Sequence, residues 1–409
     1  LVQSVSYNLA GAPIQFKFLS YNDDGFLKWE IEQFNYNGIT ATYPGLTSRI
    51  DYPLYNRQGS VVMQNIDLNG DQTLDLQYYY TYDNWNRLKD VYAQFDNSRE
   101  AGHKVASYEY DDVKGVVSHR RHYASDANCN NVEVDDVQYY YDPARFRLTE
   151  INSSLFDWRL YYDGDVGAGN GSIARNYNGN INVTEADYQL GIATNTPGNF
   201  LSSTVYSYAY DGLNRLVEAD AKIEETQQGP LDPMISGDAT YSYDKVGNFN
   251  QLQRTSFSTS GNSEVRQYVY YYGTGNNRLQ ALHRGLNGAT PSSYRSFQYD
   301  TRGNLKVDTK KNINAVTYGR ANLPWEITRN NAGLYASISY RYDVNDARIY
   351  KETRPSATGV ATTSEYYLRS ASGQELGIYD FNADELRWYV YGSDRVAQFE
   401  HLPTSNWTN

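Results

Sequence analysis

Several features that define other protein classes are scarce in this sequence. Its single cysteine, Cys129, excludes an internal disulfide and a cysteine-based metal site. No run of about 18 apolar residues occurs, so no segment is expected to cross a membrane as a helix. Helical periodicity is also missing over any long stretch, which argues against an α-helical fold.

Signatures of catalysis are absent as well. The sequence has no Gly-x-Ser-x-Gly nucleophile motif and no phosphate-binding loop of the Walker type. Its paired carboxylates, such as Asp23-Asp24 and Asp111-Asp112, fall in segments typical of turns, where nothing positions a second catalytic group. We therefore predict that the chain is not an enzyme and holds no organic cofactor. A polysaccharide-acting enzyme is the alternative that the paired carboxylates leave open.

The charge balance narrows the range of partners. The chain has 36 Lys and Arg against 48 Asp and Glu, which gives a net charge of −12. An acidic protein is repelled by phosphate backbones and by anionic lipid headgroups. We therefore expect no nucleic-acid partner and no anionic membrane as the main partner, and we interpret the acidic surface as a solvated one.

Tyrosine is the residue that the sequence has in excess, with 42 Tyr against 13 Phe and 6 Trp. A tyrosine brings a large apolar ring and a hydroxyl that needs a partner when buried. It also favours the pleated, half-buried surface of a strand. So many tyrosines predict broad sheets with aromatic faces, and the fold class that we expect is all-β.

One short phrase recurs along the chain: Tyr, then Asp or Asn, two variable residues, Gly or Asn, a polar residue and an apolar one. In its six clearest copies the defining residues are Tyr21 and Gly25; Tyr55 and Gly59; Tyr82, Asp83 and Asn86; Tyr210, Asp211 and Asn214; Tyr243, Asp244 and Gly247; and Tyr299, Asp300 and Gly303. Self-similarity of this kind is the signature of a repeat architecture.

Each part of the phrase has a physical reason. The alternating residues before it predict a strand. The Asp or Asn side chain can bond the backbone two residues on and so begin a turn. Gly or Asn tolerates the positive φ that such a turn requires. The apolar residue that follows restarts a strand, so each copy predicts one β-hairpin that must stack on its neighbours to bury its apolar face.

These hairpins predict a single array over residues 1–409. The most regular copies lie in residues 206–392, and residues 164–199 are rich in Gly and Asn and lack the phrase, so we interpret them as an irregular insert.

A calcium loop is the one metal site that the sequence indicates. Oxygen-bearing side chains alternate at Asp67, Asn69, Asp71, Thr73 and Asp75. This spacing resembles Ca²⁺-binding loops, in which carboxylate, amide and carbonyl oxygens surround the ion. The usual glycine at the sixth position is Gln72 and the usual glutamate at the twelfth is Tyr78, so a polar hairpin turn without metal remains the alternative.

With these residues in view, the chain resembles the RHS/YD-repeat family. The resemblance is carried by Tyr299-Asp-Thr-Arg-Gly-Asn-Leu305, by Asn322-Leu323-Pro324 and by Trp388-Tyr389-Val390-Tyr391-Gly392. In that family, YD repeats wind a spiral β-sheet into a hollow shell. Bacterial toxin shells of this type enclose a C-terminal toxic domain, and related repeats in animal teneurins serve adhesion.

The chain departs from the family pattern at one point. The RHS-associated core, with its self-cleavage aspartate, is expected after Gly392, but the 17 residues that remain (409 − 392) do not contain it, nor a toxin domain. The chain begins Leu-Val-Gln, and we expect it to be a piece of a longer protein. Its expected partners are then the remaining parts of that parent, the RHS core and an enclosed effector.

The resemblance implies a non-catalytic shell that encapsulates or presents a C-terminal effector and is secreted or exposed at a cell surface. The alternative is an extracellular adhesin or carbohydrate-binding surface protein. Its tyrosine-rich faces would then bind cell-surface glycans or other protein chains. Cross-strand stacking of the rings, at about 0.2–1 kcal/mol per pair, is the interpretation of the tyrosines that needs no ligand.

Overall fold

The structure is a computed structural model of the 409-residue chain. It describes residues 2–7, 13–34, 47–67, 72, 74–95, 102–125, 130–163, 177–188, 202–224, 238–257, 263–319, 321–330, 336–356, 360–383 and 385–403. These residues form 29 β-strands and no helix, so the all-β prediction is confirmed. Across these ranges no helix is long and apolar enough to traverse a lipid bilayer.

The strands follow one another in chain order. Their bounds are β1 (Val2–Tyr7), β2 (Pro13–Tyr21), β3 (Leu27–Phe34), β4 (Thr47–Tyr55), β5 (Val61–Asp67), β6 (Leu76–Tyr82), β7 (Leu88–Phe95), β8 (His103–Tyr110), β9 (Val117–Ser125), β10 (Asn131–Tyr141), β11 (Leu148–Asn152), β12 (Phe156–Tyr161), β13 (Val183–Tyr188), β14 (Ser202–Tyr210), β15 (Leu216–Glu224), β16 (Ala239–Tyr243), β17 (Phe249–Phe257), β18 (Ser263–Tyr272), β19 (Leu279–Leu286), β20 (Ser292–Tyr299), β21 (Leu305–Asp308), β22 (Ile313–Tyr318), β23 (Pro324–Arg329), β24 (Ser337–Tyr342), β25 (Arg348–Arg354), β26 (Thr363–Arg369), β27 (Glu375–Asp380), β28 (Glu385–Tyr391) and β29 (Arg395–Pro403).

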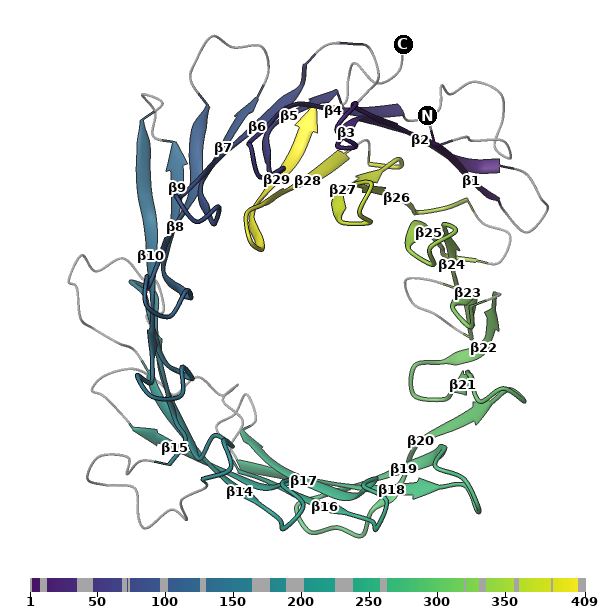
Figure 1. The fold of residues 1–409 in the computed structure, drawn as a ribbon. Coiled ribbons are helices and arrows are strands. Elements are labelled where there is room, and N and C mark those ends of the chain that lie inside the picture. The colour runs from purple at the N-terminus through teal and green to yellow at the C-terminus, as the bar shows by residue number, and fades with distance from the viewer. Residues whose placement is uncertain are drawn as a thin grey trace. The chain divides into compact units, whose positions relative to one another are not determined.

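Most strands pair with their successors in the chain. The pairing is antiparallel in an unbroken series from β1 to β8, from β10 to β21 and from β22 to β29 (Figure 1). Such a meander needs only short connections, which is what the short turn phrase of the sequence supplies.

Contacts divide the chain into two compact units. Unit 1 comprises residues 1–109, 121–134 and 312–409, and unit 2 comprises residues 110–120 and 135–311. The segment 164–199, which we interpreted as an irregular insert, contributes to unit 2: within it, β13 pairs with β12 on one side and with β14 on the other. Its described residues therefore continue the meander.

Unit 1 joins segments that are far apart in the sequence. Figure 1 shows β28 and β29, in yellow, lying against the early purple strands. Side chains on one face of β28 are fully buried here, namely Leu386, Trp388 and Val390, each 0% exposed. The alternation of strand side chains places these three on the same face, so β28 is one layer of a sheet-on-sheet packing.

Candidate functional site

The repeated hairpin turn is the first structural motif, and the copy at Asp211 shows its geometry. The backbone amide of Asp211 donates to the carbonyl of Arg215 at 2.9 Å, and one carboxylate oxygen accepts from the amides of Leu213 and Arg215 at 2.9 and 3.0 Å. Asn214 adopts a φ of 62°. These hydrogen bonds, the one from the amide of Arg215 first among them, lower the pKa of Asp211.

The other copies of the phrase repeat this turn. Their Asp or Asn accepts backbone amides two and four residues on, at Asn22, Asn56, Asp83, Asp244 and Asp300. The fourth residue after the tyrosine has positive φ throughout, at Gly25 (84°), Gly59 (82°), Asn86 (62°), Gly247 (95°) and Gly303 (93°). The register shifts by one residue just before the tyrosine, as in a β-bulge, and the tyrosine stays paired with the first residue of the next strand.

A tyrosine at the start of the turn links most hairpins to the preceding one. The hydroxyl of Tyr82 donates to the carbonyl oxygen of Val61 at 2.6 Å, and Val61 is the residue that restarts the strand after the previous turn. The same bond recurs at Tyr55 to Leu27 (2.6 Å), Tyr141 to Val117 (3.1 Å), Tyr162 to Leu148 (2.9 Å), Tyr210 to Ile181 (2.7 Å), Tyr243 to Leu216 (2.7 Å), Tyr299 to Leu279 (2.7 Å), Tyr342 to Pro324 (2.9 Å) and Tyr391 to Glu375 (2.6 Å).

We call these nine bonds the tyrosine links. Burial raises the pKa of Tyr82 and of Tyr210, so their hydroxyls stay protonated and able to donate. A net contribution of about 1 kcal/mol per bond, repeated along the array, holds successive hairpins at one spacing. The sequence predicted tyrosines on sheet faces, but it did not predict this bond. The sequence does carry a signal for a role of this tyrosine, because Tyr recurs in every copy of the phrase while the two residues after Asp vary.

An apolar seam ties the last strands to the early ones within unit 1. The indole N–H of Trp388 donates to the hydroxyl of Tyr78 at 2.6 Å, across 310 positions of sequence. The backbone amide of Ser393 donates to the hydroxyl of Tyr108 at 3.3 Å. Tyr78 and Tyr108 are 3% and 2% exposed, so both rings are buried in the seam. Gly392 is required here, because a Cβ at that position would overlap the Tyr108 hydroxyl.

A second, charged seam lies within the same unit. The ammonium of Lys17 on β2 donates to the carbonyl oxygens of Arg369 and Ser370, at 2.8 and 2.6 Å. The backbone amide of Arg369 donates in turn to the carboxylate of Glu32 on β3 at 3.0 Å, and the side-chain amide of Gln15 donates to the same carboxylate. The turn after β26 is therefore held by groups from strands at the other end of the sequence.

Two glutamates in this seam are almost inaccessible to water. Glu30 and Glu32 are 3% and 4% exposed. Burial raises the pKa of Glu32 to about 7, against which the nearby ammonium of Lys17 acts. Burial also raises the pKa of Glu30, which accepts a 2.5 Å hydrogen bond from the hydroxyl of Tyr52. This cluster was not predicted from the sequence, although two glutamates spaced by one residue in an apolar strand were its visible signal.

The predicted calcium loop is only partly described. Asn69, Asp71 and Thr73 lie outside the described residues. Asp67 is 7% exposed, and its carboxylate accepts the backbone amide of Gln72 at 2.8 Å. The amide of Asp75 donates to the carbonyl of Ile66 at 3.0 Å, at the start of the hairpin that leads into β6. The calcium site stays a prediction.

No family model and no curated protein matches the sequence. Among solved structures, the chain is similar to one described as TcdB2-TccC3-Cdc42, with a TM-score of 0.48 and 12% identity over 94% of this chain. It is similar also to the Photorhabdus luminescens Tc holotoxin pore, with a TM-score of 0.46 and 11% identity over 95% of this chain. The chain spans 20% and 22% of the length of those two chains.

Proposed function

We propose that this chain is a wall segment of a longer protein of the RHS/YD-repeat type, with no catalytic turnover, that encloses or presents another part of its parent. The tyrosine links carry this proposal. They repeat one contact between successive hairpins in both units, at Tyr82 in unit 1 and at Tyr210 in unit 2. A regular structure of this kind builds extent and stiffness, which a wall requires.

The contacts between the last and the first strands of the chain, in the two seams, also support the proposal. A linear repeat array leaves an exposed strand edge at each end, and such edges invite pairing with other chains. Here β28 is buried against strands from the beginning of the chain, through Trp388 and Tyr78. Joining the two ends of the array within one unit stabilises it in a way that stacking of neighbours alone does not.

Partners and location follow from the same proposal. The partners are the remaining parts of the parent, an RHS core and an effector, and the parent acts outside the cell that makes it. In this role the tyrosine-rich sheet is a barrier, and its acidic surface keeps the assembly soluble.

Protection of the parent's other segments from protease tests the proposal. The parent is produced at full length, and digestion by proteinase K of segments outside residues 1–409 is followed by mass spectrometry. The Trp388→Ala variant removes the buried indole of the apolar seam. Trp85→Ala is the matched control, because Trp85 is 77% exposed.

We expect those segments to resist digestion in the wild type and in Trp85→Ala, and to be cut faster in Trp388→Ala. Rapid digestion in the wild-type protein, at the rate of an unprotected peptide, would rule out an enclosing wall. That outcome would favour the adhesin alternative, in which the sheet presents a binding surface.

A further inference from the structure

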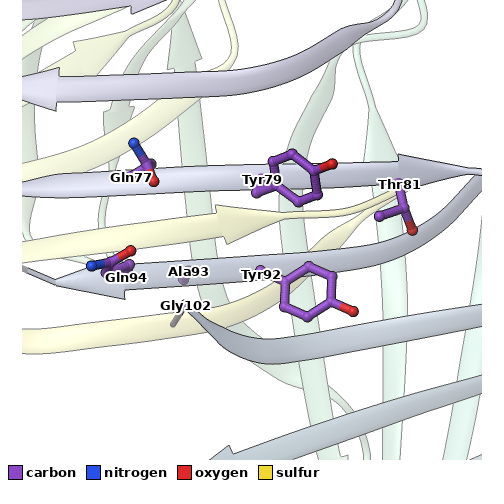
Figure 2. Close-up of a pocket in the computed structure, with 7 residues that line it drawn as sticks. All are labelled: Gln77, Tyr79, Thr81, Tyr92, Ala93, Gln94 and Gly102. Atoms are coloured by element: carbon purple, nitrogen blue, oxygen red, sulfur yellow. The ribbon is translucent and has the colours of Figure 1, made fainter. Parts of the chain in front are cut away.

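A groove lies on β6 and β7 of unit 1, on the face opposite the apolar seam. It has a volume of about 300 Å³, within the range of small-molecule clefts. Figure 2 shows two tyrosine rings side by side, with two glutamines at one end and a threonine at the other. The residues that line it include Gln77, Tyr79, Thr81, Tyr92, Gln94 and Gly102.

The strand register places these side chains on one face. Gln77 lies opposite Gln94, and Tyr79 lies opposite Tyr92. The intervening residue, Tyr78, points to the other face and bonds Trp388. Because side chains alternate along a strand, the residues that bury the seam and the residues that line the groove are separate sets. The groove can therefore be altered without touching the seam.

The two tyrosine rings form an open aromatic surface in the groove. Tyr79 is 39% exposed, so part of its ring is open to solvent. Its centroid lies 6.1 Å from that of Tyr92, and the two rings are inclined by 58°. The ammonium of Lys104 lies over the Tyr92 ring at 5.6 Å, whereas the Tyr79 ring faces the groove. An aromatic face with its negative quadrupole attracts polarised C–H groups.

Hydrogen-bonding groups lie at both ends of this aromatic surface. At one end the side-chain amide of Gln77 donates to Asn65 at 2.8 Å, which fixes its orientation beside Gln94. At the other end the hydroxyl of Thr81 donates to the carboxylate of Asp90 at 2.8 Å. Side chains that are held by neighbours bind a ligand with less loss of rotamer freedom.

The described residues that line the groove are all uncharged near neutral pH. Beside them, the charged side chains of Lys104 and Asp90 form an ion pair at 2.9 Å. The whole chain is acidic, with a net charge of −12. A ligand rich in carboxylate or sulfate is repelled by that field. A ligand that is neutral, has C–H faces and is ringed by hydroxyl groups matches the groove in each respect.

We propose that this groove binds a neutral glycan, with one pyranose ring packed on Tyr79 and its hydroxyl groups bonded by the glutamines and Thr81. An extended polypeptide is a poorer match, because the groove lies on the face of the sheet. The backbone N–H and C=O groups of β6 and β7 are already paired with each other, so a peptide strand would find no ladder partners.

Gly102 shapes the groove. A Cβ built at this position would lie 3.5 Å from the Cβ of Gln94 and 3.6 Å from the carbonyl oxygen of Ala93, so a side chain fits without overlap. A longer side chain at 102 would extend over the floor of the groove. Gly102→Leu is therefore expected to block the groove and to leave the strand pairing intact.

The test uses the whole chain and a panel of soluble oligosaccharides, with binding measured by saturation-transfer NMR and titration calorimetry. The panel holds neutral glucose-, mannose- and N-acetylglucosamine-based oligosaccharides and, as acidic probes, uronate oligosaccharides. The variants are Tyr79→Ala, Tyr79→Trp and Gly102→Leu. Tyr271→Ala is the control, because Tyr271 is an exposed strand tyrosine (46%) in unit 2.

We expect a neutral member to bind, about tenfold more weakly in Tyr79→Ala and Gly102→Leu, and with wild-type strength in Tyr79→Trp and Tyr271→Ala. Circular dichroism spectra of the variants establish that the sheet is retained. Absence of binding across the panel overturns the proposal. So does binding of acidic probes only, or binding that is equal in all four variants. Each of these results leaves the wall function untouched, because protease protection does not depend on the groove.

Discussion

Replacing Glu32 with glutamine isolates the energetic cost of a carboxyl group buried in the charged seam. Glu32 is 4% exposed and lies between Gln15 of β2 and the backbone amide of Arg369. Glutamine has nearly the same shape and keeps an oxygen that can accept from that amide. The substitution therefore removes the titration of the group and leaves most of the packing in place.

The size and sign of the effect follow from the pKa of Glu32. Burial raises it from 4.5 to about 7, so between these pH values the folded chain keeps a proton that the unfolded chain has released. The free energy of unfolding then falls as the pH rises. The contribution of the neutral carboxyl is complete below pH 4.5 and is lost on approaching pH 7. The loss is about 3 kcal/mol, at about 1.4 kcal/mol per pKa unit.

Urea unfolding at a series of pH values from 5 to 8 measures this. Intrinsic fluorescence and far-UV circular dichroism are recorded together, since coincident transitions are needed for a single free energy. We expect the stability of the wild type to fall by about 2.5 kcal/mol more than that of Glu32→Gln over this range, because part of the loss occurs below pH 5. Glu218→Gln, at an exposed position of β15, should keep the wild-type profile. An unchanged pH profile in Glu32→Gln would refute the reasoning.

Three further predictions concern the links, the apolar seam and the calcium loop. Tyr82→Phe removes one tyrosine link and should lower the free energy of urea unfolding by about 1 kcal/mol. Tyr21→Phe, at a 47% exposed ring, should change it little, and equal losses would contradict the role of the link. Gly392→Ala should cost about 1–3 kcal/mol by overpacking against Tyr108. In a double-mutant cycle with Tyr108→Phe the costs should be less than additive, whereas strict additivity would mean no contact. Calcium at a hundredfold excess over its dissociation constant should stabilise the chain by about 2.7 kcal/mol, measured as a higher melting temperature. The Asp67→Asn variant should abolish this increase. If calcium does not change the melting temperature of the wild type, the loop is a polar turn without metal.

The local part of this fold was predictable because the turn phrase encodes it in adjacent residues. Asp211 and Asn214 interact only three positions apart, in a turn that the residue types themselves favour. The strand alternation next to each turn then fixes which side chains share a face. The all-β class and the hairpins could therefore be predicted from the sequence without knowledge of distant contacts.

The seams were not predictable on the same grounds. Trp388 and Tyr78 are 310 positions apart, and nothing in either local segment specifies the other. The raised pKa of Glu32 could not be predicted from the sequence either. It depends on the burial of Glu32 against the turn at Arg369, which is brought there by the packing of unit 1. The groove at Tyr79 required the register of β6 and β7, which decides whether two tyrosines are neighbours or face opposite sides.

The most direct test of the wall is a cryo-EM map of the full-length parent. The account predicts a continuous hairpin array with density for other parts of the parent, ordered or not, on its enclosed side. A map with an empty or solid interior, and with an ordered partner bound on the outward face of the sheet, would contradict it.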